Sequence, residues 1–142
     1  MIQLVKFKAE HVRDLIPLSA VNALCGHLRD DQLAALEKSD HSFTGMVDGK
    51  VIGCAGVIRY WEGRGEAWAI FDPSIGRRLY CEIRNIARRL FDVMPYRRIE
   101  AVIVADFAPG RRFAESLGFR LEAPCLKGYF PEGQDAALYA RT

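Results

Sequence analysis

The stretch Arg111-Arg112-Phe113-Ala114-Glu115-Ser116-Leu117-Gly118-Phe119 decides how the fold of this chain is interpreted. It predicts a short amphipathic helix that can begin at Pro109, because proline lacks only a donor that the first helical turn leaves unpaired. Gly118 can end this helix in the left-handed conformation that favours glycine. A strand, a turn and a second strand closing on Asp135-Ala136-Ala137-Leu138-Tyr139 are expected to follow.

This helix resembles the helix ending in Leu-Gly-Phe that is common in the GCN5-related N-acetyltransferase (GNAT) superfamily. A helix cap that packs a phenylalanine on a sheet would explain Leu117-Gly118-Phe119 alone. The resemblance continues, however, in Gly128-Tyr129-Phe130-Pro131-Glu132-Gly133-Gln134-Asp135-Ala136, which is similar to the branch that acetylates protein amino termini. The two segments together favour the family.

The composition is typical of one folded domain spanning residues 1–142. Apolar residues make up 50% of the 142 and charged residues 27%, which excludes disordered and fibrous classes. The N-terminus lacks the layout of a signal peptide, and no apolar run approaches the roughly 18 residues that a membrane span needs. We therefore expect a soluble, cytoplasmic protein that does not enter a membrane.

The cysteines do not indicate a metal site. Cys25, Cys54, Cys81 and Cys125 are widely separated, no Cys-x-x-Cys pair occurs, and no histidine stands at ligand spacing from any of them. We expect free thiols and no structural metal.

Positive charge is concentrated in one part of the chain. The formal net charge is only +2, yet the window from Arg77 to Arg112 holds nine arginines against Glu82, Asp92, Glu100 and Asp106. Such a patch could hold a phosphorylated cofactor, could touch nucleic acid or could be a solvated helix face. Binding of nucleic acid is disfavoured because no aromatic residues for base stacking alternate with the arginines.

Apolar periodicity and turn residues predict the remaining elements. The hairpin signal Asp48-Gly49 and the turn Glu62-Gly63-Arg64-Gly65 separate three strands. Pro17 interrupts the first predicted helix, which otherwise extends to Leu18, and Pro95 ends the longest one. The predicted strands are 2–7, 41–47, 51–60, 66–71 and 99–104, and the predicted helices are 10–15, 30–39 and 77–93.

The predicted order βααβββαβαββ matches the GNAT fold independently of the resemblance. The fold class is α/β, or more narrowly α+β, with a central, mostly antiparallel mixed sheet. One parallel, splayed pair is expected between 66–71 and 99–104, because the helix 77–93 supplies the crossover that parallel strands need.

The resemblance implies acetyl-CoA as co-substrate. In the family, an Arg/Gln-x-x-Gly-x-Gly/Ala loop before the long helix holds the pyrophosphate through backbone N–H groups and the positive end of the helix dipole. Here the loop reads Phe71-Asp72-Pro73-Ser74-Ile75-Gly76-Arg77-Arg78, which keeps only the final glycine. The candidate phosphate-binding residues are Ser74, Ile75, Gly76, Arg77 and Arg78. An ordinary turn with Ser74 as N-cap is the alternative.

The resemblance also places the pantetheine arm of the cofactor in the splay between the two parallel strands. Backbone groups carry this contact, so it depends little on side chains. The candidate residues on the first strand are Trp68, Ala69, Ile70 and Phe71, and on the second, within Ala101 to Val104, the candidate is Val104.

Two side chains are candidates for catalysis. Glu66 matches the place of a glutamate that acts as general base in some family members, with a solvent-exposed hairpin residue as the alternative. The tyrosine that usually acts as acid is replaced by Ala114, and the expected asparagine is absent at Asp106-Phe107. Tyr129 is the best remaining hydroxyl, with Tyr139 and Cys125 behind it, although a tyrosine packed on a sheet edge is equally ordinary.

These observations support two hypotheses. The first is an acetyl-CoA-dependent N-acetyltransferase acting on an amine. The resemblance of the last hairpin favours an amino group of a protein or peptide as the acceptor. The second is a non-catalytic GNAT-fold module, for example one derived from a phage, that has an altered cofactor loop and serves as a binding or structural domain. Because many relatives pair through their terminal strands, a homodimer is a further hypothesis.

Overall fold

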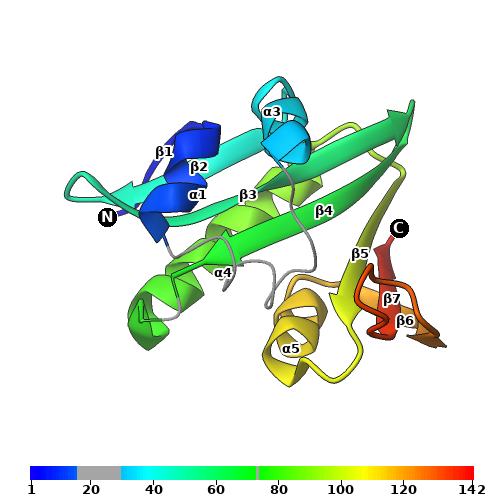
Figure 1. The fold of residues 1–142 in the computed structure, drawn as a ribbon. Helices are drawn as coiled ribbons and strands as arrows, with labels where there is room; N and C mark the ends of the chain where they lie inside the picture. The colour runs from blue at the N-terminus through cyan, green and yellow to red at the C-terminus, as the bar shows by residue number, and fades with distance from the viewer. Residues whose placement is uncertain (16–29, 73) are drawn as a thin grey trace.

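A computed structural model describes residues 1–15, 30–72 and 74–142. The predicted ends of the first helix at Pro17 and Leu18, together with Cys25 and Pro73, lie outside these ranges. Over the described ranges, the predicted order βααβββαβαββ is confirmed (Figure 1). The elements are β1 Gln3–Lys6, α1 Ala9–Leu15, α3 Asp30–Glu37, β2 Ser42–Val47, β3 Lys50–Trp61, β4 Arg64–Phe71, α4 Gly76–Val93, β5 Arg98–Val104, α5 Ala108–Ser116, β6 Arg120–Leu126 and β7 Ala136–Arg141.

The strands form one mixed sheet in the order β1-β2-β3-β4-β5-β7-β6. Neighbouring strands are antiparallel except β4 and β5, which are parallel as predicted. The predicted turn between β2 and β3 is confirmed, since Asp48 and Gly49 both have positive φ, at 51° and 78°. Two such residues give the turn a twist that matches antiparallel strands.

The turn between β3 and β4 is shorter than predicted. Only Glu62 and Gly63 lie outside the strands, and Gly63 alone of these four residues has a positive φ, at 87°. Gly65 belongs to β4 and is needed for packing, because a Cβ there would lie 2.5 Å from the Val57 side chain. A glycine that allows close approach was therefore interpreted from the sequence as a turn residue.

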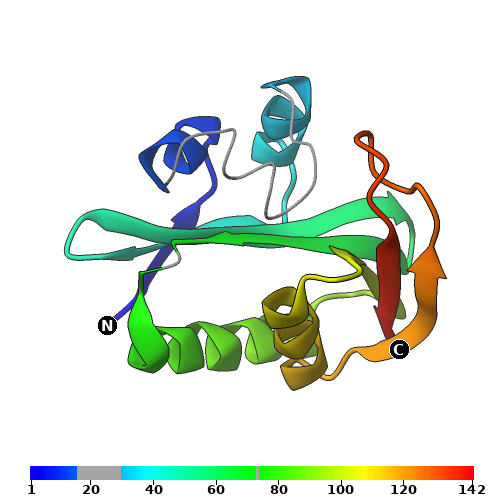
Figure 2. The ribbon, with the colours of Figure 1, turned by 60° about the horizontal axis from the view of Figure 1, so that its bottom comes forward.

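Helices cover both faces of the sheet. Figure 2 shows α1 and α3 over one face and α4 and α5 over the other. Side chains of β4 alternate between them: Ile70 packs in the cluster with α1 and α3, and Ala67 packs against the cluster that includes α5. Three described cysteines, Cys54, Cys81 and Cys125, are free thiols, as expected.

Helix α4 is amphipathic as its apolar spacing predicted. Leu79, Ile83, Ile86 and Leu90 are half-buried, whereas Arg88 on the same helix is exposed. The helix ends where Met94 turns to an extended conformation, with ψ 142°, directly before Pro95. No described helix has the length and apolarity to cross a membrane.

The parallel strands β4 and β5 separate soon after they meet. Their register consists of Arg64 with Arg98, Gly65 with Ile99 and Glu66 with Glu100. Beyond these pairs β5 diverges from β4 (Figure 1) and pairs with β7 along its other edge. The predicted splay is confirmed, and it begins at Glu66.

Candidate active site

A pocket of ≈ 310 Å³ lies at the point where β4 and β5 begin to separate. Its polar and aromatic lining comes from the end of β3, the start of β4, β5 and the connection between β6 and β7. The residues are Tyr60, Trp61, Arg64, Glu66, Glu100 and Tyr129. Val102, Leu126 and Leu138 add an apolar wall.

Strand register explains why these side chains share one face. Glu66 pairs with Ile58 on β3 and with Glu100 on β5, and residues directly paired across strands point to the same side of a sheet. Ile58 packs against the cluster that includes α1 and α3, so the pocket opens on that face. Tyr60 lies at an irregularity in the ladder between β3 and β4, where a bulge can re-aim a side chain.

The pKa values of the two carboxylates in the pocket are shifted in opposite directions. Burial raises the pKa of Glu66, although the Tyr60 hydroxyl and the charge of Arg64 oppose this rise. Hydrogen bonds from Arg64 and then Arg98 hold the pKa of Glu100 at about 2. Two neighbouring acids whose environments separate their pKa values are the usual arrangement when one of them accepts protons near neutral pH.

Glu100 is buried within a chain of charged groups. Arg64 donates two hydrogen bonds to it, from Nε to Oε2 at 2.5 Å and from Nη2 to Oε1 at 2.9 Å. Arg98 donates from Nε to Oε2 at 2.7 Å and reaches on to both carboxylate oxygens of Glu122. Such bidentate pairs fix geometry as well as charge.

The guanidinium of Arg64 also stacks on aromatic rings. Its Cζ lies 4.9 Å from the ring centroid of Tyr60 and 4.4 Å from that of Trp61, both within cation–π range. Tyr60 and Trp61 are 45% and 57% exposed, so they form the outer rim of the pocket. Arg64 is thus held by its ion pair with Glu100 on one side and by aromatic faces on the other.

Tyr129 reaches the pocket from the connection between β6 and β7. Figure 2 shows this connection rising on the same side of the sheet as α1 and α3. Burial and then the charges of Glu66 and Glu100 raise the pKa of the Tyr129 phenol. The structure therefore brings Glu66 and Tyr129 together, whereas their catalytic roles stay predictions.

The two reserve candidates for a proton donor lie elsewhere. Tyr139 is fully buried, donates to Glu115 Oε2 at 3.0 Å and accepts from Arg111 Nε at 3.0 Å. Cys125 is exposed, and its nearest polar partner is Asp135. Neither residue lines the pocket.

The loop after β4 has an unusual acidic centre. Asp72 Oδ1 accepts from the Ser74 backbone N–H at 2.9 Å and from the Ser74 hydroxyl at 2.7 Å, and Lys50 Nζ lies 3.8 Å from Oδ2. The hydrogen bonds from Ser74 keep the pKa of Asp72 below its usual value. The carboxylate therefore stays ionised and occupies two donors of the loop.

Ser74 is not the N-cap of α4, which corrects the alternative interpretation of this loop. Ile75 occupies the N-cap position, and no side chain makes a capping hydrogen bond there. The Ser74 hydroxyl is committed to Asp72 because that carboxylate stands two residues away, at the spacing of an Asx turn. The N–H groups of the first helical turn thus keep their usual lack of intrahelical acceptors.

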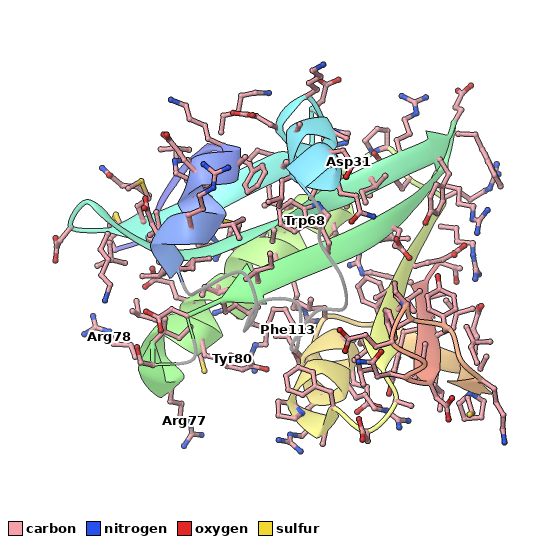
Figure 3. The ribbon with its side chains drawn as sticks, viewed as in Figure 1. Asp31, Trp68, Arg77, Arg78, Tyr80 and Phe113 are labelled. Atoms are coloured by element: carbon pink, nitrogen blue, oxygen red, sulfur yellow. The ribbon has the colours of Figure 1, made fainter. Side chains whose placement is uncertain are left out.

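The remaining loop candidates surround this helix start. Gly76 has φ 78° and no atom within 4 Å of the position of a Cβ. Arg77 and Arg78 are exposed, and Figure 3 shows them extending in different directions from the first turn of α4. A ligand at the helix end would have to draw them together.

Phe71, which stands where the family has a basic residue, has a packing role. Its ring lies 5.0 Å from that of Phe113 on α5, which in turn lies 5.4 Å from Tyr80 on α4 (Figure 3). Trp68, by contrast, packs edge-on against Phe7 at 5.1 Å on the opposite face. Side chains of the predicted cofactor strand are therefore used for the core, and its backbone is what can serve a ligand.

Sequence reasoning missed four of the six polar and aromatic residues of the pocket: Tyr60, Trp61, Arg64 and Glu100. Arg64 was assigned to a turn and Tyr60 to the end of a strand, whereas Trp61 fell between the two predicted elements. Glu100 carried a signal, since it is the one carboxylate in the apolar segment Ile99–Val104. Among the described residues, no group of histidine, cysteine, aspartate or glutamate could hold a metal ion.

A search of solved structures finds acetyltransferases over nearly the whole chain. An acetyltransferase (GNAT family) from Bacillus anthracis matches with TM-score 0.73 and 20% identity, covering 99% of this chain and 93% of that one. The ribosomal-protein-S5-alanine acetyltransferase from Vibrio fischeri matches with TM-score 0.70 and 19% identity, covering 99% of this chain and 92% of that one. Spermidine N-acetyltransferase from Vibrio cholerae, in complex with CoA and spermine, matches with TM-score 0.73 and 16% identity, covering 99% of this chain and 94% of that one.

These likenesses, with the strand order and the splay, show that the chain has the fold of the GCN5-related N-acetyltransferases. No protein-family model matches the sequence, and a search of curated proteins finds no match either.

Proposed function

We propose that this protein is an acetyl-CoA-dependent N-acetyltransferase that modifies an amine of a protein or peptide. The observation that carries the proposal is the pairing of Glu66, a half-buried carboxylate of raised pKa, with Tyr129 in a pocket where β4 and β5 separate. A base and an acid that line one cavity are what amide formation from an ammonium group needs.

The described residues fit acetyl-CoA in part. The splayed backbone from Trp68 to Phe71, with Val104 across from it, would hold the pantetheine arm. Ser74 to Arg78 would hold the pyrophosphate through first-turn N–H groups and the two arginines. The Asp72 carboxylate works against this second contact, because it already binds Ser74 and repels an anion.

In this scheme the co-substrate supplies an acyl group activated as a thioester. Glu66 accepts a proton at its carboxylate from the ammonium group of the acceptor, which frees the nitrogen lone pair to form the new C–N bond. The C–S bond then breaks, Tyr129 donates its phenolic proton to the departing sulfur, and the second proton of the nitrogen returns to the Tyr129 phenolate, which leaves a neutral amide. A raised pKa suits Glu66 to this role, because its proton affinity then comes closer to neutral pH.

The choice of a protein or peptide acceptor rests on two observations. The segment from Gly128 to Ala136 resembles the branch that acetylates protein amino termini, and it carries Tyr129 into the pocket. One structural relative is named for an alanine of a ribosomal protein and another for spermidine, so the fold serves both peptide and small amines. The cytoplasmic location and the homodimer stay predictions.

The alternative is a non-catalytic GNAT-fold module, and the acidic loop favours it. Asp72 occupies donors that the family reserves for phosphate, and Arg77 and Arg78 do not converge on one point. On this alternative the pocket binds a partner, and acetyl-CoA does not bind at all.

The deciding experiment is thermal unfolding with and without millimolar acetyl-CoA. A ligand at about 100 times its dissociation constant stabilises the native state by about 2.7 kcal/mol, which raises the midpoint clearly. A shift followed by acetyl transfer to a peptide library, lost in Glu66→Gln, would support the enzyme. A well-folded sample with no shift and no transfer would favour the module.

A further inference from the structure

We propose that the pocket accepts a single ammonium group, and that Arg64 is the residue that excludes an acceptor with a second positive charge nearby. This inference rests on the proposed function and narrows its substrate class. The acceptor would be a monoamine whose neighbouring groups are uncharged, such as a peptide amino terminus without a basic residue beside it. Short diamines would be rejected.

The backbone alone would suit a diamine. Glu66 and Glu100 are paired across the parallel strands, so their Cα atoms are separated by about the 4.8 Å spacing of adjacent strands and their side chains share a face. Two carboxylates placed in this way could each bind one ammonium group of a short diamine. The side chains around Glu100 prevent this.

Both oxygens of the Glu100 carboxylate are already bound by the protein's own cations. Arg64 binds both of its oxygens at 2.5 and 2.9 Å, and Arg98 adds a third hydrogen bond at 2.7 Å. A second ammonium group would have to displace an arginine from a bidentate pair, which is among the stronger polar contacts in proteins.

The faces of the two aromatic rings at the rim of the pocket are likewise covered by a cation of the protein itself. Exposed Tyr60 and Trp61 rings next to carboxylates are a typical site for a cation, yet Arg64 stacks on both. The protein therefore places its own cation where the second positive charge of an acceptor would otherwise lie.

The charge balance leaves room for one cation. Arg64 offsets Glu100, and Arg98 bridges from Glu100 to Glu122. Within the described residues Glu66 has no ion-pair partner, and its polar neighbour is the Tyr60 hydroxyl. One unmatched carboxylate remains, and it is the one placed to accept a proton from the acceptor.

The test compares two acceptors of equal length, 4-amino-1-butanol and 1,4-diaminobutane. We expect the wild type to show a kcat/KM at least about tenfold higher for the monoamine, which corresponds to one modest charge repulsion at short range. Arg64→Gln should reduce this preference to near equality or reverse it, because Glu100 then offers an open oxygen. Arg64→Lys is the matched control that keeps the charge and should keep the preference.

Equal use of both amines by the wild type would overturn the inference, and so would an unchanged preference in a folded Arg64→Gln. The wild-type ratio alone decides if that variant does not fold. If neither amine is acetylated, calorimetric titration of the same two amines separates the two proposals. Selective binding of the monoamine would uphold the pocket while counting against the enzyme, and no binding of either at millimolar concentration would overturn the inference.

Discussion

The pocket at the start of β4 and the loop at its end differ in how their charged side chains are paired. In the pocket, arginines and carboxylates pair across three strands and leave Glu66 as the one carboxylate without an ion pair among the described residues. In the loop, Asp72 binds the donors next to it, while Arg77 and Arg78 extend into solvent. One end of the strand is organised for a cation, and the other is poorly organised for an anion.

If the proposed function holds, this difference indicates which end of the site has tolerated change. The long arm of the cofactor is expected to contact strand backbone, which a substitution hardly alters. Recognition of the acceptor depends on side chains in fixed register. On the proposed function, this chain keeps an ordered pocket for the acceptor while its loop for the phosphates diverges, and the following experiments test each end separately.

The largest effect is expected at Glu66. Glu66→Gln removes the proposed base and should lower kcat/KM by about 10²- to 10⁴-fold. Stabilisation by acetyl-CoA should stay unchanged, since the substitution lies at the pocket end of β4. Glu62→Gln in the exposed turn is the control and should be fully active. Loss of cofactor binding in Glu66→Gln would show that the two ends are not independent.

The same substitution should stabilise the fold at neutral pH. The folded pKa of Glu66 is raised, so the folded chain binds this proton more tightly than the unfolded chain, and that stability is lost as the pH rises through the folded pKa. Glutamine avoids this cost, so Glu66→Gln should unfold at higher urea concentration at pH 7 and match the wild type at low pH. A variant less stable than the wild type at pH 7 would contradict the burial of a charged group.

Glu100 should show the opposite dependence on pH. Its folded pKa is about 2 against an ordinary value of 4.5, so its contribution is complete above about 4.5 and disappears as the pH falls toward 2. Glu100→Gln should cost about 2 kcal/mol at neutral pH, the order of charge-assisted hydrogen bonds. Urea unfolding across this pH range should show the two proteins converging in acid, and a constant difference would rule out the ion pairs as its cause.

At the loop, Arg78→Glu should weaken acetyl-CoA binding by about tenfold, because it reverses a charge in the first turn of α4 where the helix dipole favours anions. Arg89→Glu makes the same change near the far end of this helix, also at an exposed position, and should leave the affinity unaltered. Equal affinities for Arg78→Glu and the wild type would remove this turn from the cofactor site.

The smallest effect is expected from Asp72→Asn. Removing the carboxylate charge next to the proposed phosphate site should tighten acetyl-CoA binding by about fivefold. Asp48→Asn in the β2–β3 turn removes the same charge where asparagine also tolerates a positive φ, and should have no effect. Weaker binding in Asp72→Asn would mean that the Asp72–Ser74 contacts shape the loop for its ligand.

The sequence predicted the fold closely because the fold depends on local signals. Asp48-Gly49 specified a hairpin, Pro95 ended α4, and the segment up to Gly118 specified α5. The site was predicted less completely. Glu66 and Tyr129, predicted separately as base and acid, line the same pocket, but Arg64 was predicted to be a turn residue. Its role depends on pairing with Glu100, 36 positions away, which only the strand register reveals.

Ser74 illustrates a second reason for incomplete prediction. A serine just before a helix usually caps it, and the sequence offered no sign that Asp72 would take its hydroxyl first. Two short polar side chains two residues apart compete for the same backbone donors, and their competition is settled by loop geometry. Interpretation of motifs therefore fails most readily where several capping residues are adjacent.

The position of β7 has a consequence for how the protein is made. This strand lies between β5 and β6, although it follows both in the chain. Until β7 emerges from the ribosome, β5 is attached to the sheet by only three residue pairs with β4, and its opposite edge is open. The nascent chain thus carries an exposed apolar strand late in synthesis, when pairing with another chain is the main hazard, and slow translation near residue 130 would prolong that interval.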